Sequence, residues 1–381
     1  MKKMKSYLFA LLMGAAVALS FTSCSDDKLG PSIFPDESDV LDPSSSTYKF
    51  DKWLKENYLV PYNLDFRYRL QDVGTNMNYN LVPADFERSI DLALLTKYLW
   101  FDVYKDVVNE NFLKTYGPRI IHLIGSPAYN PTSGTMILGL AEGGVKVTLY
   151  RVNAMNIDDI EMMNEYYFKT MHHEFAHILH QTITYPATFR TFSAGFYDGS
   201  NWQDRQTEVL NSQGFVTNYA CSAVREDFAE TIANFIMLSD ADWEHIYEMA
   251  SRGWATKSSA DDPNAVYYCF YYYTNNEVNE EGLTYVAESQ LVKTVDENGD
   301  TVYYVGRLTD SEGNRIKAYP VPDTDGVDGP AVIRQKIETA RQWLGSEFGV
   351  NLDALREEVQ KRQLTYKAKL EELRKEVENM Q

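Results

Sequence analysis

The sequence has few cysteines, few histidines and a deficit of basic residues, and each shortage narrows the range of functions. Its 381 residues include three cysteines and no Cys-x-x-Cys pair, so a cysteine-based zinc site is not indicated. Lysine and arginine total 36 against 55 aspartates and glutamates, a formal net charge of −19. Nucleic-acid binding needs clustered positive charge, and so does broad adhesion to anionic lipid. No nucleic-acid partner is therefore expected.

Long hydrophobic runs are also scarce: we find one, Leu8–Leu19, and no internal repeat. The run follows a lysine-rich start and is too short for a comfortable membrane span, which is typical of a signal peptide over residues 1–23. It ends in small residues before Cys24, a pattern that resembles the lipobox of bacterial lipoproteins. We expect Cys24 to be lipidated; the alternative is an ordinary signal peptide followed by an incidental cysteine.

The next residues favour a tether that leads to a folded body. The Ser-Asp-Asp sequence after the cysteine resembles the acidic signal that sends lipoproteins to the outer cell surface of some Gram-negative bacteria. Residues 24–46 are rich in Ser, Asp and Pro, which predicts a solvated tether. Residues 47–381 form the folded body, where Cys221 and Cys269 are either paired in a disulfide or present as two buried thiols.

Four of the six histidines lie between residues 172 and 180. Here His173, Glu174 and His177 form the H-E-x-x-H pattern of zinc hydrolases. Residues four apart share one face of a helix, so both imidazoles can reach one ion. Glu174 is offset by about 100° and lies beside the ion, where it could take a proton from a zinc-bound water. The alternative is a polar helix face with incidental histidines.

The flanking residues predict that this motif lies on a helix. Asn156 is a candidate N-cap, and Asp158 and Asp159 in the first turn would oppose the positive helix end. Apolar residues along the segment supply a face for burial, and Pro186 bounds the helix.

The chain before the motif is expected to combine helices with a small sheet. Residues 48–58 and 83–111 carry apolar side chains at helical spacing, and a proline begins the second segment. Between residues 118 and 153 the period changes to that of strands, with a Gly-Gly turn. His122 lies in one of these strands, and we interpret it as structural. The predicted fold class is therefore α+β.

A catalytic zinc site usually has three protein ligands and one open position, so the two histidines need a third partner. The metzincin continuation of the motif fails, because His180 stands in its glycine place and Ile183 in its last histidine place. His180 shares a helix face with His173 but lies about 10.5 Å along the axis, too far to bind the same ion. We expect His180 to support the ligands or to line the cleft.

A later segment, residues 222–237, reads as a helix with Ser222 as its N-cap. Glu226 and Glu230 share one face of this helix. We assign Glu226 as the third ligand, and Glu230 as the acceptor of a hydrogen bond from a ligating imidazole. The alternative is a solvated acidic helix start.

The motifs His173-Glu-Phe-Ala-His177 and Glu226-Asp-Phe-Ala-Glu230 are similar to those of gluzincins of the anthrax lethal factor type. With the lipobox, the chain resembles the substrate import-associated zinc metallohydrolase lipoproteins. The resemblance implies a zincin-like fold, in which the outer strand of the sheet holds an extended peptide beside the zinc. It also implies that Tyr219, seven residues before the glutamate ligand, stabilises the oxyanion.

The resemblance further implies an outer-membrane setting on the cell exterior, near a TonB-dependent transporter and its glycan- or peptide-binding lipoprotein. We expect one Zn²⁺ per chain and hydrolysis of a peptide or glycopeptide by water that Glu174 activates. The alternative function is a non-catalytic glycan- or peptide-binding surface lipoprotein, in which zinc is a scaffold.

The remaining chain carries fewer functional signals. Residues 267–273 are strongly aromatic and form either a core strand or a sugar-stacking platform. Two turn signals between about 289 and 322 predict a small β insertion. Residues from about 331 to 380 are expected to be helical, with an amphipathic packing helix over 352–380.

Overall fold

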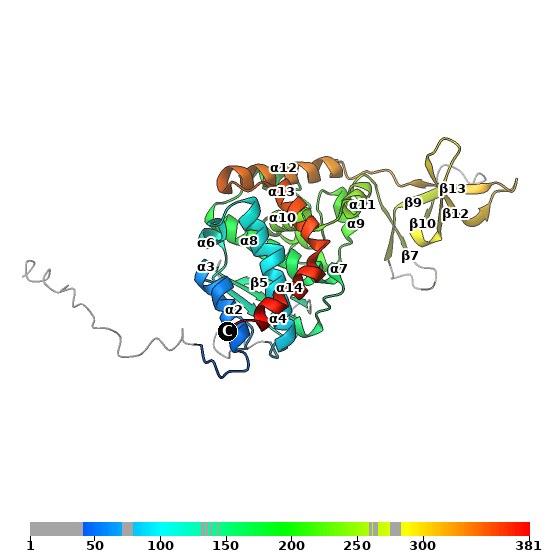
Figure 1. The fold of residues 1–381 in the computed structure, drawn as a ribbon. Coiled ribbons are helices and arrows are strands. Elements are labelled where there is room, and N and C mark those ends of the chain that lie inside the picture. The colour runs from blue at the N-terminus through cyan, green and yellow to red at the C-terminus, as the bar shows by residue number, and fades with distance from the viewer. Residues whose placement is uncertain are drawn as a thin grey trace, which may run out of the picture. The chain divides into compact units, whose positions relative to one another are not determined.

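The structure, a computed structural model, describes most of the chain beyond the predicted tether (Figure 1). The described residues are 41–70, 79–130, 134, 136–137, 139–142, 145–258, 261, 266–274 and 283–381. The predicted signal peptide, Cys24, most of the tether and the Gly143–Gly144 turn lie outside them. Within the described residues, no helix is both long enough and apolar enough to cross a membrane.

The chain divides into two compact units, Met1–Asp51 and Lys52–Gln381. Of the first unit, residues 41–51 are described. Asp42 accepts a hydrogen bond of 2.8 Å from the backbone of Ser44 and so stabilises a turn. Helix α2, Tyr48–Leu54, begins shortly after it, as the apolar spacing predicted.

The second unit opens with helical segments that supply much of its core. Their bounds are η3 Lys55–Leu59, α3 Val60–Tyr62, α4 Phe86–Thr96, η4 Lys97–Phe101, α5 Asp102–Val107 and α6 Phe112–Tyr116. The helix predicted over 83–111 is shorter, because Asp85 caps it by accepting a bond from the Arg88 backbone N–H. Pro83 instead pairs with Ile124 in an isolated β-bridge.

Four strands form the sheet expected before the motif helix, in the order β1-β2-β6-β5. Their bounds are β1 Asp65–Arg67, β2 Ile120–Leu123, β5 Gly139–Glu142 and β6 Lys146–Leu149. Strands β1, β2 and β6 are parallel, whereas β5 runs antiparallel to β6 and lies at an edge. His122 is buried in β2, in register with Thr148 of β6. A short ladder joins β3, Ala128–Tyr129, to β4, Met136–Ile137.

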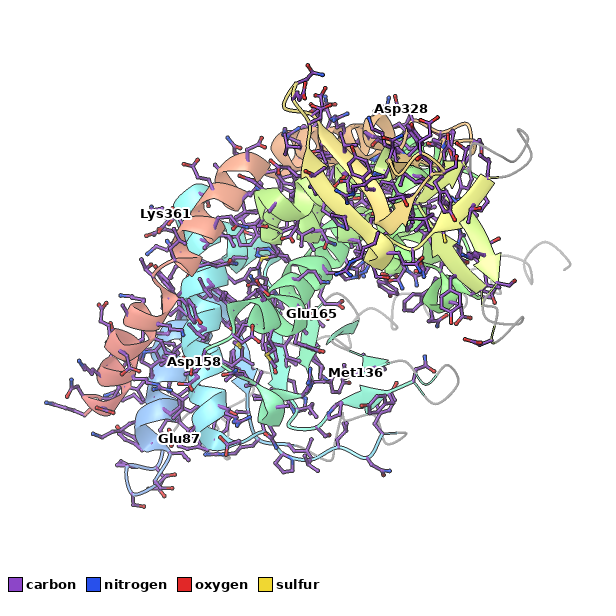
Figure 2. All side chains as sticks on the ribbon, turned by 90° about the vertical axis from the view of Figure 1, so that its right-hand side faces the viewer. Glu87, Met136, Asp158, Glu165, Asp328 and Lys361 are labelled. Atoms are coloured by element: carbon purple, nitrogen blue, oxygen red, sulfur yellow. The ribbon has the colours of Figure 1, made fainter. Side chains whose placement is uncertain are left out.

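The motif helix is one helical run over residues 160–182. It comprises α7 Ile160–Met163, the π-helical segment η6 Asn164–Phe168 and α8 Lys169–Thr182, and Figure 2 labels Glu165 in its middle segment. The predicted cap is wrong: Asp159, not Asn156, accepts a bond of 2.9 Å from the Met162 backbone N–H. Asn156 instead bonds the backbone of Asp158 in the preceding turn.

Helix α8 packs against both β5 and α10, Val224–Met237 (Figure 1). The N-cap of α10 is Ala223, so the predicted capping by Ser222 is wrong: Ser222 ends the short helix η9, Tyr219–Ser222. Helices α9, Thr207–Ser212, and α11, Asp240–Ala250, pack against each other and against α12, Gly329–Phe348. The remaining short helical turns are η5 Val152–Ala154, η7 Ala187–Thr191, η8 Trp202–Asp204 and η10 Glu288–Gln290.

The β insertion is larger than the turn signals indicated. It contains a hairpin of β7 and β8 and a five-stranded sheet of order β10-β9-β13-β12-β11. The bounds are β7 Ala255–Ser258, β8 Val266–Cys269, β9 Tyr271–Thr274, β10 Leu283–Val286, β11 Leu291–Val295, β12 Thr301–Thr309 and β13 Arg315–Pro320. Both predicted hairpin turns are present, between β11 and β12 and between β12 and β13.

The aromatic run at 267–273 spans β8 and β9 and is partly core and partly surface, and its use as a sugar-stacking platform stays a prediction. Tyr271 and Cys269 are buried, whereas Tyr267 is 54% exposed. Cys221 and Cys269 are both free buried thiols, so the two cysteines do not form a disulfide with each other.

Three helices close the chain: α12 Gly329–Phe348, α13 Leu352–Gln363 and α14 Tyr366–Glu378. The helix predicted over 352–380 is therefore two helices, which Leu364 and Thr365 separate. Helix α13 packs on α10, which carries Glu226, and α14 packs on α4. The α+β class predicted from the sequence is confirmed.

Candidate metal centre

Helices α8 and α10 bring three polar atoms together. His173 and His177 lie one turn apart on α8, and their Nε2 atoms are 3.0 Å apart. Oε2 of Glu226, in the first turn of α10, is 3.2 Å from Nε2 of His173 and 3.0 Å from Nε2 of His177. All three residues are at most 9% exposed. The two histidines and the later glutamate thus come together in space, as the sequence predicted.

The three atoms fit a zinc ion by geometry and by chemistry. A tetrahedral zinc site with bonds of about 2.0–2.1 Å separates its ligand atoms by roughly 3.3–3.4 Å, close to the triangle seen here. Two imidazoles and one carboxylate are also a donor set that catalytic zinc sites use. Among the residues that the structure describes, His173, His177 and Glu226 are the one group of three placed to hold a metal ion.

The electrostatics of the site favour a positive charge at its centre. Burial lowers the pKa of His173, but the carboxylates of Glu226 and Glu230 outweigh it and raise this pKa to about 10. Burial also opposes ionisation of Glu226, yet the bonds from both histidines hold its pKa well below the usual range. The carboxylate is therefore ionised and available to a cation.

Glu230 supports His173 from the side opposite the other candidate ligands. Its Oε1 lies 2.8 Å from Nδ1 of His173. Its Oε2 accepts bonds of 2.8 Å from Thr217 and 3.0 Å from the side chain of Asn234. Burial raises the pKa of Glu230, but His173 and the other partners lower it to about 2. An ionised acceptor at Nδ1 leaves Nε2 of His173 free to face a metal.

His180 occupies the corresponding place beside His177. Its Nε2 lies 2.8 Å from Nδ1 of His177, one turn further along α8. Burial lowers the pKa of His180 to about 4, so its imidazole is neutral at neutral pH. His180 thus contacts the candidate ligand His177 and does not itself belong to the group of three candidate ligands.

Glu174 and Tyr219 both lie close to this centre. Glu174 is 8% exposed, and its charge raises the pKa of both His173 and Tyr219. The ring centroid of Tyr219 is 5.8 Å from that of His173 and 4.8 Å from that of Trp202. Burial first, and then the Glu226 carboxylate, raise the pKa of Tyr219 well above its ordinary value. Its hydroxyl therefore keeps its proton and can donate a hydrogen bond.

Comparison with known proteins decides the family. Residues 44–353 match a family described as "Putative zinc-binding metallo-peptidase". The chain belongs to this family. A crystal structure of a protein of the same description from Bacteroides caccae, at 2.10 Å resolution, matches with a TM-score of 0.54 and 30% identity. The match covers 82% of this chain and 91% of that one. No curated protein matches the chain significantly.

Family membership makes the chain, in general terms, a zinc metallopeptidase, and the converging His173, His177 and Glu226 are where this metallopeptidase could hold its ion. Sequence reasoning missed other contacts of the site. Asn234 lies one turn after Glu230, so helical spacing could have identified it. Thr217 carries no such signal, because it lies outside helix α10 and contacts Glu230 only through tertiary packing.

Arg225 is a further contact that sequence reasoning missed. Its Nε donates a bond of 2.8 Å to Oε1 of Glu226, the carboxylate oxygen that does not face the histidines. The Arg225 side chain is 67% exposed, whereas that of Glu226 is 8% exposed. The guanidinium thus holds the carboxylate from the solvent side.

Proposed function

We propose that this metallopeptidase is a gluzincin-type zinc peptidase with a zincin-like fold. His173, His177 and Glu226 hold one Zn²⁺, Glu174 is the general base, and Tyr219 is the oxyanion donor. The observation that carries the proposal is the triangle of two Nε2 atoms and one Oε2 atom with edges of 3.0–3.2 Å. The Nδ1 atoms of both histidines have partners of their own, which leaves the Nε2 atoms to the metal.

The protein residues around the ion divide the work of hydrolysis. When bound, zinc acts as a Lewis acid on an amide carbonyl and lowers the pKa of water. Glu174 accepts the proton of the attacking water and passes it to the amine nitrogen of the leaving group. Tyr219 donates its hydroxyl hydrogen to the carbonyl oxygen as negative charge develops there. Glu230 and His180 keep the imidazoles in the orientation that ligation requires.

The substrate that this arrangement favours is an extended peptide or glycopeptide. Strand β5 is an edge strand in the sheet order, and it packs on the helix that carries the two histidines. An edge strand offers unpaired backbone groups, to which an extended chain adds by main-chain hydrogen bonds. A peptide on β5 would run beside α8 and close to Glu174.

The sequence features of the N-terminus supply the cellular part of the proposal. Lipidation at Cys24 would anchor the enzyme in the outer membrane of a Gram-negative bacterium, facing the exterior. There it would act beside a TonB-dependent transporter and its binding lipoprotein. Cys24→Ser should abolish labelling by a lipid precursor and release the protein from membranes, and unchanged membrane retention would contradict the anchor.

Glu174→Gln tests the catalytic assignment. The substitution keeps the size of the side chain and removes the base, so zinc content and folding should be retained. Cleavage of a peptide library should fall by roughly 10² or more, the usual scale for the loss of general-base catalysis. Wild type and variant are compared at matched zinc content. Equal cleavage by both would assign the activity to a contaminant, and no cleavage by either would favour the second candidate function.

The second candidate is a surface that binds glycan or peptide on the five-stranded sheet. Neighbouring strands place Tyr285, Tyr272 and Tyr319 in one row. Tyr319 is 48% exposed, and its ring centroid lies 6.0 Å from that of Tyr272. Tyr272 and Tyr285 are half-buried. A row of aromatic rings that is at least partly exposed suits stacking on sugar or peptide planes. Tyr319→Ala should then weaken binding to a glycan or peptide array without changing zinc content, and unchanged array binding would exclude this surface.

A further inference from the structure

A lysine and an aspartate are completely buried near the metal centre. The side chains of Lys336 in α12 and Asp227 in α10 are 1% and 0% exposed, and Nζ lies 2.6 Å from Oδ2. Nζ also donates a bond of 2.7 Å to the Gly214 carbonyl and lies 4.2 Å from the centre of the Phe215 ring. The Tyr197 hydroxyl donates a bond of 2.8 Å to the same carboxylate oxygen of Asp227.

Stability alone does not explain why the core holds this ion pair. Removing two charges from water costs more than burying apolar side chains of the same volume, so a hydrophobic pair is often as stable or more stable. The surroundings here are aromatic, and Lys336 lies over Phe215 and near Phe189. A buried ion pair in such a place fixes the relative position of the two elements that carry it, because each charge is stabilised only where the opposite charge lies within hydrogen-bond distance.

On α10, that geometry concerns the candidate metal ligand directly. Asp227 follows Glu226 in the chain and comes three residues before Glu230. It therefore sits in the helical turn that holds both carboxylates, on the side turned to the protein interior. Lys336 and Tyr197 hold this turn from two directions through one oxygen, so rotation or axial sliding of the turn would break both contacts.

On the other side, Lys336 holds the chain segment that leads to the rest of the site. Gly214 precedes Thr217, which bonds Glu230, and Tyr219, which faces His173. The approach of this segment to α12 is close: Gly214 has φ +86°, and a Cβ there would lie 2.2 Å from the side chain of Val332. Lys336 thus ties one point of α12 to both segments.

We infer that Lys336 is a positioning residue of the metal centre. Through Asp227 it fixes the turn of α10 that presents Glu226 and Glu230, and through the Gly214 carbonyl it fixes the segment that presents Thr217 and Tyr219. The inference rests on the proposed zinc site, and it assigns to α12 a part in the geometry of a site whose proposed ligands lie on α8 and α10.

The test removes the charges as a pair, because a single substitution would leave a buried charge without a partner and could prevent folding. The double variant Lys336→Met with Asp227→Asn keeps side-chain volume and carries no buried charge. The matched control is Arg374→Met with Asp91→Asn. That pair joins α14 to α4 at 2.6 Å, and neither helix carries a residue of the site. Zinc affinity is measured by competition with a chromophoric chelator, and thermal unfolding is recorded for each metal-free protein.

We expect the Lys336 and Asp227 double variant to unfold near the wild-type temperature without metal, but to bind zinc about tenfold or more weakly, the scale for partners of metal ligands. The control pair should keep wild-type zinc affinity. Wild-type affinity in the first double variant, or an equal loss in the control, would overturn the inference.

Tyr197→Phe decides the question if the double variant does not fold. This substitution removes one hydroxyl from Asp227 and leaves the ion pair intact, and it should weaken zinc binding several-fold while unfolding stays near wild type. Unchanged affinity in that variant would overturn the inference. Absence of zinc binding in the wild type would instead refute the proposed function, whereas zinc binding without peptide cleavage leaves the affinity comparison valid.

Discussion

At the residue scale, the candidate metal centre consists of three facing atoms, each with one partner behind it. These pairs are His173 with Glu230, His177 with His180, and Glu226 with Arg225. A histidine can present Nε2 to a metal only if its proton sits on Nδ1, and the partner at Nδ1 decides this. In the proposed site, these partners should therefore matter nearly as much as the three ligands.

Glu226→Ala and Glu230→Ala should separate a ligand from its support. Glu226→Ala removes one of three ligands and should leave the purified protein without stoichiometric zinc. Glu230→Ala leaves all three in place and should weaken zinc binding by about 10–100-fold, the range for outer partners of a ligating histidine. Metal analysis and chelator competition measure both. A metal-free Glu230→Ala beside a zinc-loaded Glu226→Ala would mean that the two roles are exchanged.

At the element scale, the distance between β5 and α8 depends on one glycine. A Cβ at Gly139 would lie 2.2 Å from Cγ2 of Thr170, which lies on α8 about one turn before His173. Only a residue without a side chain lets the edge strand approach the motif helix so closely. The edge that we propose to bind substrate is thereby held against the helix that carries the two proposed histidine ligands.

Gly139→Ala should therefore reduce stability and peptide cleavage together. Overpacking of this kind costs about 1–3 kcal/mol of unfolding free energy, and a shifted β5 would misplace the peptide. Thr170→Ser removes the clashing Cγ2 atom, so the double variant should recover most of both losses. Denaturant unfolding and cleavage rates check this, and a Gly139→Ala protein with wild-type stability would show that β5 can move at no cost.

At the scale of the whole molecule, ion pairs from the C-terminal helices tie the parts of the second unit together. Arg374 of α14 binds Asp91 of α4, and Arg362 of α13 pairs with Asp106 of α5. Lys336 of α12 reaches Asp227 of α10. The last helices thus hold elements that lie far apart in the sequence, so the metal site and the global fold should respond to one another.

Zinc removal should lower the unfolding temperature of the whole second unit. A metal that binds the folded state stabilises it by mass action, by about 2.7 kcal/mol at a hundredfold excess over the dissociation constant. Calorimetry after chelation, and again after stoichiometric zinc is restored, measures the shift. His173→Ala should show no such response, since it lacks a ligand. A wild-type unfolding temperature that is the same with and without zinc would contradict a site in the folded core.

Local patterns in the sequence predicted the features that depend on helical spacing. His173 and His177 share a face because they are four residues apart on any α-helix, and Glu226 and Glu230 do so for the same reason. The strands around His122 and the hairpin turns of the insertion also follow from local period and turn residues. Caps were less accurate. Asp159 takes the place assigned to Asn156, because several polar residues compete at that helix start. Helix α10 begins after Ala223, which makes no side-chain capping bond, and so starts one residue later than assigned.

The sequence by itself determined the class of fold, the H-E-x-x-H helix and the choice of Glu226 as the partner of His173 and His177. Only the tertiary structure decided which residues stand behind them. Thr217 bonds Glu230, and Lys336 pairs with Asp227 from 109 residues away along the chain (336 − 227), through contacts that no local period encodes. The physical reason is that periodicity specifies which residues share a face, whereas packing specifies what that face meets.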